Sequence, residues 1–204
     1  MLIIQEDQKQ RMKVNQVTVF WWVVMKQIIS SKLARDRFAE GLYKMCYRNG
    51  ELMICRQSVL EMQRGIQIIK GLLEKMRITS EELGRIRNIK NAILKALGEH
   101  FSSGGTFDKV QQDIESAGYE KHWPIRRLVE SISKDTTILD LSLQTFMPQI
   151  VDLSDPKRSD DDVAYMSKLA KSTLSSAESV LQTLGLWLEK LIDRIREMDT
   201  ASAA

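Results

Sequence analysis

The residue types that most often carry catalysis are few in this chain and lie far apart. The 204 residues include two histidines, His100 and His122, and two cysteines, Cys46 and Cys55. These spacings match no structural zinc site, and no histidine lies near either cysteine in the sequence to activate it as a nucleophile. We therefore predict a protein that is not an enzyme and that holds no metal or cofactor.

Each of these residues has a structural role that accounts for it. The two cysteines flank Asn49-Gly50, and in either a helix or a two-residue hairpin they would not lie opposite each other. We interpret them as buried free thiols. His100 falls near the expected end of a helix, where the helix dipole favours an imidazolium. His122 precedes Trp123-Pro124 and is interpreted as a residue that packs in a loop.

Three further motifs resemble binding sites but are incomplete. Gly104-Gly105-Thr106 lacks the Gly-Lys-Ser/Thr ending of a phosphate-binding loop, and the acidic stretch 155–162 lacks the central glycine and final glutamate of a calcium loop. Ser159 precedes three aspartates, which suits a kinase that prefers acidic sequences. The same pattern is typical of a helix N-cap, and we favour the cap.

Charge is unevenly distributed along the chain. The net charge is +8 over residues 1–100 and −5 over residues 101–204, which gives +3 in total. The two halves could attract each other, or the basic half could contact a polyanion. The candidate contact residues are the densest basic group: Lys70, Lys75, Arg77, Arg85, Arg87, Lys90 and Lys95. Glutamates interrupt this group and no aromatic residue lies within it, so an ordinary solvated helix surface is the preferred interpretation.

The clearest pattern is a heptad repeat of apolar residues over 52–76. Steps of three and four residues connect Leu52, Cys55, Val59, Met62, Ile66, Ile69, Leu73 and Met76. This spacing is typical of a coiled-coil seam. A second stripe beside it contains Met53, Leu60, Ile68 and Leu72. A helix with two adjacent apolar faces must pack against at least two others.

The C-terminal region has a similar pattern in two overlapping parts. The first contains Val163, Met166, Ala170, Thr173, Ala177, Val180 and Leu184. The second contains Leu181, Leu184, Leu188, Leu191, Ile195 and Met198. A change from one stripe to the other predicts a stutter in the packing, and Gly185 could allow a bend there.

Few glycines and prolines (10 and 3) favour long helices over strands. We predict an all-α, elongated helical bundle of six to eight helices, with long helices near 51–76 and 160–198 and an irregular middle. A helical domain at 1–153 would contain helices 13–48, 51–77 and 80–101, followed by short helices at 106–117, 124–133 and 135–147. Residues 154–162 would form a linker, and 163–204 a long helix that packs on the first part or on a partner.

The helix boundaries rest on local signals. Asn49-Gly50 is interpreted as the end of the first helix. Thr79-Ser80-Glu81-Glu82 has the pattern of a capping box. The segment 17–25 is the most apolar, but its residue types also suit a strand.

The location of the protein is inferred from missing signals. No cationic start leads into an apolar core, and the run 17–25 is about half of a membrane span. We therefore predict a cytoplasmic protein in a reducing compartment, with no transmembrane segment and no peripheral membrane contact. A nuclear location and export without a signal stay open.

The leading functional hypothesis is a non-enzymatic helical interaction protein: an adaptor, a chaperone-like binder or a self-assembling subunit. Its interaction seam would be Leu52, Val59, Met62, Ile66, Ile69, Leu73, Met76, Leu181, Leu184, Leu188, Leu191 and Ile195. The partner would be another protein or a second copy. One alternative is an RNA-binding or other nucleic-acid-binding protein, perhaps viral, that uses the basic half. In architecture alone, two long terminal helices around an irregular middle also resemble filament and tip subunits of bacterial type III secretion.

Overall fold

The computed structural model describes residues 37–75 and 77–202, and this part of the chain is helical without a strand. The all-α prediction is therefore confirmed. The chain divides into two units, Met1–Gly50 and Glu51–Ala204. The predicted helix start at 13 and the run 17–25 lie outside the described residues. In the first unit the structure describes only helix from Arg37 onward.

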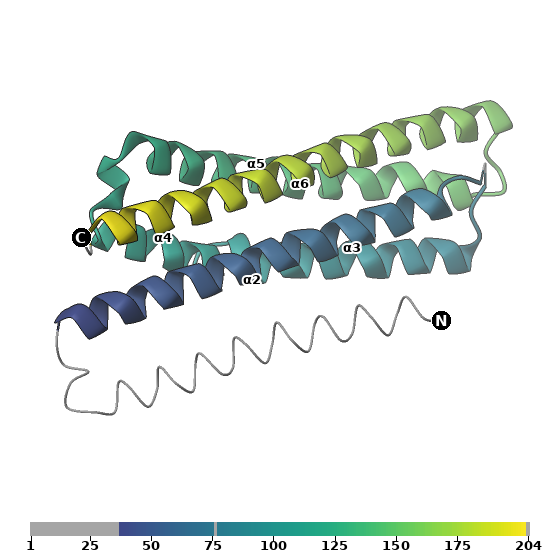
Figure 1. Cartoon of the computed structure of the whole chain (residues 1–204). Helices are drawn as coiled ribbons and strands as arrows, with labels where there is room; N and C mark the ends of the chain where they lie inside the picture. Colours follow the sequence, from purple (N-terminus) through teal and green to yellow (C-terminus); the bar gives the residue numbers. More distant parts are fainter. Residues whose placement is uncertain (1–36, 76, 203–204) are drawn as a thin grey trace, which may run out of the picture. The chain divides into compact units, whose positions relative to one another are not determined.

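Five α-helices and two short 3₁₀ segments make up the described chain (Figure 1). They are α2 (Arg37–Leu72), α3 (Ser80–Phe101), α4 (Thr106–Ser116), η2 (Tyr119–Lys121), α5 (Trp123–Val151), η3 (Asp152–Ser154) and α6 (Asp160–Ser202).

Helix α2 corrects the prediction that Asn49-Gly50 ends a helix. It runs without interruption from Arg37 to Leu72 and includes both residues. A glycine inside a helix costs only about 1 kcal/mol relative to alanine. The buried heptad positions that follow, from Leu52 to Leu73, supply enough packing to outweigh this local preference.

The start of α3 confirms the predicted capping box. The Thr79 hydroxyl accepts from the Glu82 amide at 3.1 Å, and the Thr79 amide donates to the Glu82 carboxylate at 2.8 Å. Helix α4 then follows Gly105, where a Cβ would lie 2.9 Å from the Ser102 carbonyl oxygen. Only glycine fits this close turn.

Helix α5 is a single 29-residue helix where we predicted two short ones, so that prediction is wrong. Its buried residues are Ile125, Val129, Ile132, Leu139, Leu143, Phe146 and Ile150. Asp135 lies in the gap of this stripe between Ile132 and Leu139, where it accepts a hydrogen bond from Trp187 at 3.1 Å. The second of the predicted short helices ended at 147, but α5 includes Pro148 and continues to Val151.

Helix α6 begins at the predicted cap, since the Asp162 amide donates to the Ser159 hydroxyl at 3.1 Å. The predicted stutter is not present among the residues described. One heptad stripe is buried throughout: Val163, Ser167, Ala170, Leu174, Ala177, Leu181, Leu184, Leu188, Leu191 and Ile195. Met166, Thr173 and Val180, members of the first predicted stripe, are only partly buried.

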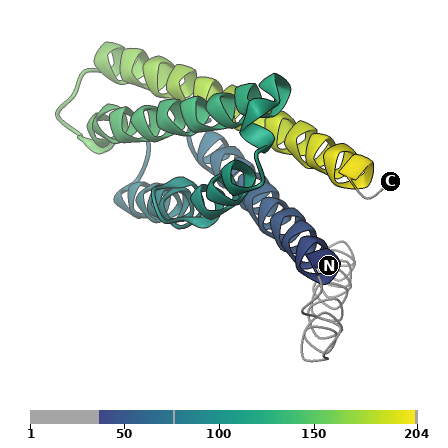
Figure 2. The same cartoon turned by 90° about the vertical axis from the view of Figure 1, so that its left-hand side faces the viewer.

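Residues 51–204 share one core. Helices α5 and α6 pack along each other, and this pair lies above α3 and residues 51–72 of α2 in both views (Figures 1 and 2). Gly65 of α2 faces Ile89 and Ile93 of α3. The segment 154–162, predicted as a linker, connects two helices of the same unit, and α6 packs on the chain itself. No helix in the described ranges has the length and apolarity of a membrane span.

Candidate interaction surface

The residues of the predicted interaction seam lie inside the core that the chain forms with itself. Met76 is outside the described residues. The other eleven are nearly inaccessible, with exposures of 0–1%: Leu52, Val59, Met62, Ile66, Ile69, Leu73, Leu181, Leu184, Leu188, Leu191 and Ile195. Their heptad spacing is satisfied by neighbouring helices of the same chain. A surface available to a partner must therefore be formed by other residues.

A groove between α2 and α6 is the strongest candidate for that surface. Gly185 of α6 and Val59 of α2 both line the groove, and Gly185 has no side chain to fill it. A Cβ at Gly185 would lie 3.7 Å from Val59 Cγ1 of α2. Leu60 and Ile68 of α2 and Leu186 of α6 line the groove.

The lining is apolar and open to solvent. Leu186 is 54% exposed and Ile68 is 45% exposed. Met53 of α2 is also exposed. Met53, Leu60 and Ile68 belong to the second stripe seen in the sequence. The first stripe is thus buried in the core, while much of the second remains on the surface.

Amide side chains lie between the apolar residues of the groove. Gln63 and Gln67 extend from α2, and Gln182 extends from α6. An amide group both donates and accepts hydrogen bonds. The groove can therefore bind an apolar side chain and, beside it, either a hydrogen-bond donor or a hydrogen-bond acceptor.

Ion pairs join α2 to α6 at both ends of the groove. At one end, Arg56 Nε and Nη2 lie 2.9 and 2.5 Å from Glu189 Oε1. At the other end, Lys70 Nζ lies 2.6 Å from Glu178 Oε2, and Gln67 also donates to Glu178. Exposed pairs of this kind contribute about 0–1 kcal/mol each. Their main effect is to fix the register of two antiparallel helices.

The basic residues predicted to contact a polyanion do not form one continuous stripe. Lys70 pairs with Glu178, as described above, and Lys75 Nζ lies 2.5 Å from Glu82 Oε1. Lys95 lies 3.6 Å from Glu99. In the part of the chain that the structure describes, the remaining members on α3 make no ion pair: Arg85, Arg87 and Lys90. The density of positive charge in the sequence is therefore partly neutralised in the fold.

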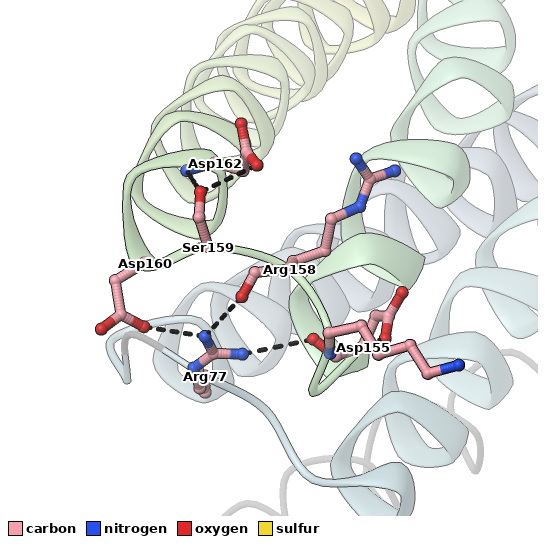
Figure 3. Close-up of polar contacts among 7 residues, drawn as sticks. Arg77, Asp155, Arg158, Ser159, Asp160 and Asp162 are labelled. Carbon is pink, nitrogen blue, oxygen red and sulfur yellow. Dashed lines mark hydrogen bonds and ion pairs between the residues drawn. The ribbon is translucent and has the colours of Figure 1, made fainter.

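Arg77 is the most highly connected member of this basic group (Figure 3). It lies between α2 and α3, and its guanidinium reaches the connection between η3 and α6. It donates to the carbonyl oxygens of Asp155 and Arg158 at 3.2 and 2.9 Å, and to Asp160 Oδ1 at 2.7 Å. Arg77 thus ties the two inter-helix connections together, which is a structural role.

The residues that line the groove include neither histidine and do not include Cys55. His100 Nδ1 lies 3.1 Å from Thr106 Oγ1, in the last turn of α3. Burial, with a smaller effect of Glu51, raises the pKa of the Cys55 thiol to about 12. Within the described ranges, no three His, Cys, Asp or Glu side chains are grouped as metal ligands would be.

The second apolar stripe in the sequence includes groove residues of α2, but no predicted stripe includes the α6 residue Leu186. Leu186 follows Gly185, and both lie outside the heptad stripe of α6. The only signal is an apolar residue off the stripe beside a glycine. Searches of family models, curated proteins and solved structures found no match to the chain.

Proposed function

We propose that this chain is a non-enzymatic protein-interaction module, and that the groove between α2 and α6 binds an amphipathic helix of a partner protein. The observation that supports this is the exposure of Leu186 and Ile68, which line adjoining parts of the groove beside Leu60. Recognition of a helix in such a groove uses apolar anchors three, four or seven residues apart.

The energetic argument begins with the exposed aliphatic side chains. Each square ångström of apolar surface removed from water contributes about 25 cal/mol. Leu186 and Ile68 are both roughly half exposed, so each can still bury area against a partner. A helix docked along the groove would cover both, because Leu186 and Ile68 line adjoining parts of it that share Leu60.

Polar groups beside these residues would give the contact its specificity. Exposed apolar surface alone would bind many sequences, whereas Gln63, Gln182 and the Arg56–Glu189 pair must each keep a hydrogen-bonding partner when covered. A helix that leaves one of them buried without a partner loses about 1–3 kcal/mol. These polar groups therefore select for partner helices whose own polar residues can hydrogen-bond to them.

The experiment uses a fluorescently labelled 18-residue amphipathic peptide with leucines at heptad spacing, and a scrambled peptide of the same composition. Binding to the full chain is measured by fluorescence anisotropy. We expect saturable binding of the first peptide only. The double variant Leu186→Gln/Ile68→Gln should weaken it about tenfold, since two anchors are lost.

Leu141→Gln is the matched control, because Leu141 is 56% exposed on α5 and does not line the groove. It should bind the peptide as the unmodified chain does. Equal binding of the scrambled peptide, or an equal loss in the control, would refute the proposal. Light scattering at several concentrations distinguishes a second copy as the partner: self-association would then also depend on Leu186.

A further inference from the structure

A second hollow lies between the beginning of α5 and the C-terminal half of α6, and its chemistry differs from that of the α2–α6 groove. It has a volume of about 460 Å³. Its lining includes two tryptophans and three basic residues: Trp123 and Arg127 of α5, and Trp187, Lys190 and Arg194 of α6. We call it the tryptophan hollow.

Each tryptophan of the hollow lies beneath a cation. Arg127 Cζ is 5.0 Å from the ring centroid of Trp123, and Lys190 Nζ is 4.8 Å from that of Trp187. Both distances are within the range of a cation–π interaction. Each cation is therefore positioned over an indole face at the hollow.

The two rings differ in how firmly they are held. The Trp187 indole N–H donates to Asp135 Oδ2 at 3.1 Å, and the ring packs partly into the core. Trp123 is 65% exposed, at the first residue of α5. The hollow thus combines one fixed ring with one ring whose surface is still mostly in water.

The charges of the hollow are only partly balanced. Arg194 pairs with Glu197 at 2.6 Å, and Asp193 lies 4.0 Å from Arg196. The Asp135 carboxylate accepts the hydrogen bond from the Trp187 indole. Among the residues that the structure describes, Arg127 and Lys190 have no carboxylate partner and interact only with the indole rings. The positive charge left over lies directly beside apolar aromatic surface.

We propose that the tryptophan hollow binds a partner peptide segment in which a carboxylate neighbours a large apolar side chain. The carboxylate would pair with Arg127 or Lys190, and the apolar side chain would cover Trp123. Tryptophan and arginine are the residue types most enriched among the energetic centres of protein interfaces. A hollow of this size is also in the range that encloses small ligands.

Charge complementarity favours an acidic peptide over a nucleic acid. Asp193 and Glu197 line the same hollow, and they would repel the closely spaced phosphates of a nucleic acid. Single strands also need successive exposed rings on which bases stack, whereas only Trp123 is largely exposed here. A short peptide can place one carboxylate and avoid the two acidic side chains.

The test measures anisotropy of a fluorescein-labelled peptide built from repeated Asp-Phe units, with the full chain near physiological salt. We expect saturable binding that is weakened at least tenfold by Arg127→Gln/Lys190→Gln, and similarly by Trp123→Ala. Lys168→Gln/Lys171→Gln is the matched control, since it removes the same charge from α6 at residues that do not line the hollow. It should leave the affinity unchanged.

Peptide variants separate the two parts of the recognition. With a peptide in which Asp is replaced by Asn, the Arg127/Lys190 substitutions should no longer lower the affinity. With a peptide in which Phe is replaced by Ser, Trp123→Ala should no longer lower it. Leu186→Gln should have no effect, so this result is independent of the α2–α6 groove. Absent peptide binding, an equal loss in the lysine control, or binding only to oligouridylate or to phosphatidylserine vesicles would overturn the proposal.

Discussion

Gly65 offers the sharpest test of how closely α2 and α3 pack. A Cβ at this buried position would lie 3.0 Å from Ile93 Cδ1, 3.2 Å from Ile89 Cγ2 and 3.3 Å from Ile93 Cγ1. The Cδ1 atom ends a flexible side chain and can move. The Cγ2 atom is attached to a branched β-carbon, so it moves only if χ1 of Ile89 changes. Gly65→Ala must therefore strain the interface.

Two opposing effects determine how much Gly65→Ala changes the free energy of unfolding. Alanine is about 1 kcal/mol more favourable than glycine inside a helix. Overpacking of a well-packed core costs about 1–3 kcal/mol. Because two isoleucine side chains must yield and one of them is stiff, we take the middle of that range. Gly65→Ala should then lower the free energy of unfolding by about 1 kcal/mol, the difference between these two effects.

Gly84→Ala is the matched control, because Gly84 lies within α3 and a Cβ there would meet nothing within 4 Å. It should gain about 0.5–1 kcal/mol from helix propensity alone. For a chain of this size 1 kcal/mol corresponds to roughly 2–4 °C in Tm. The two variants should thus shift Tm in opposite directions in a calorimetric or circular-dichroism melt. If Gly65→Ala stabilises the chain as Gly84→Ala does, the close α2–α3 contact is wrong.

Three further predictions concern titratable groups. The pKa of Glu82 is lowered to about 2 by Lys75 and by the Thr79 amide, so the Glu82 carboxylate stabilises the fold above its ordinary pKa of 4.5 and loses this effect as the pH falls towards 2. The difference in urea midpoint between the unmodified chain and Glu82→Ala should therefore shrink over that interval, and a constant difference would contradict this. The Cys55 thiol, with its pKa raised to about 12 by burial, should react with iodoacetamide only after denaturation, as peptide mass spectrometry would detect; rapid labelling of the folded chain would refute its burial. Burial also raises the pKa of Asp135, so the negative charge of this side chain disfavours folding above its ordinary pKa. Asp135→Asn keeps an acceptor for Trp187 and should raise the urea midpoint at pH 7 but not at pH 3; an equal effect at both pH values would argue against burial as the cause.

Local sequence signals predicted the ends of helices well when the signal involved side-chain hydrogen bonds. Thr79 with Glu82, and Ser159 with Asp162, cap their helices as expected. Gly50 misled the prediction because its cost is small and tertiary packing outweighs it. A glycine can end a helix, but nothing in its own sequence position says whether the next turn will be buried.

The apolar periodicity located the core correctly but not the surface that remains. Leu52, Val59 and Leu184 were recognised as members of heptad stripes, and they are buried. A single sequence does not show whether such a stripe is covered by the same chain or by another. The groove residue Leu186 could not be found this way, because it lies outside the heptad stripe of α6 and its neighbours in the groove include residues of α2. The continuity of α5 was missed because its buried apolar stripe is interrupted between Ile132 and Leu139.

The contacts of Arg77 have a consequence for how the connection before α6 can change. Two of its three acceptors are main-chain carbonyl oxygens, at residues 155 and 158. Every amino acid offers such an oxygen, so the side chains at these two positions are free to vary without loss of the contact. The number of residues between them is not, since one residue fewer displaces a carbonyl by up to about 3.8 Å. This stretch should accept substitutions readily and tolerate deletions poorly.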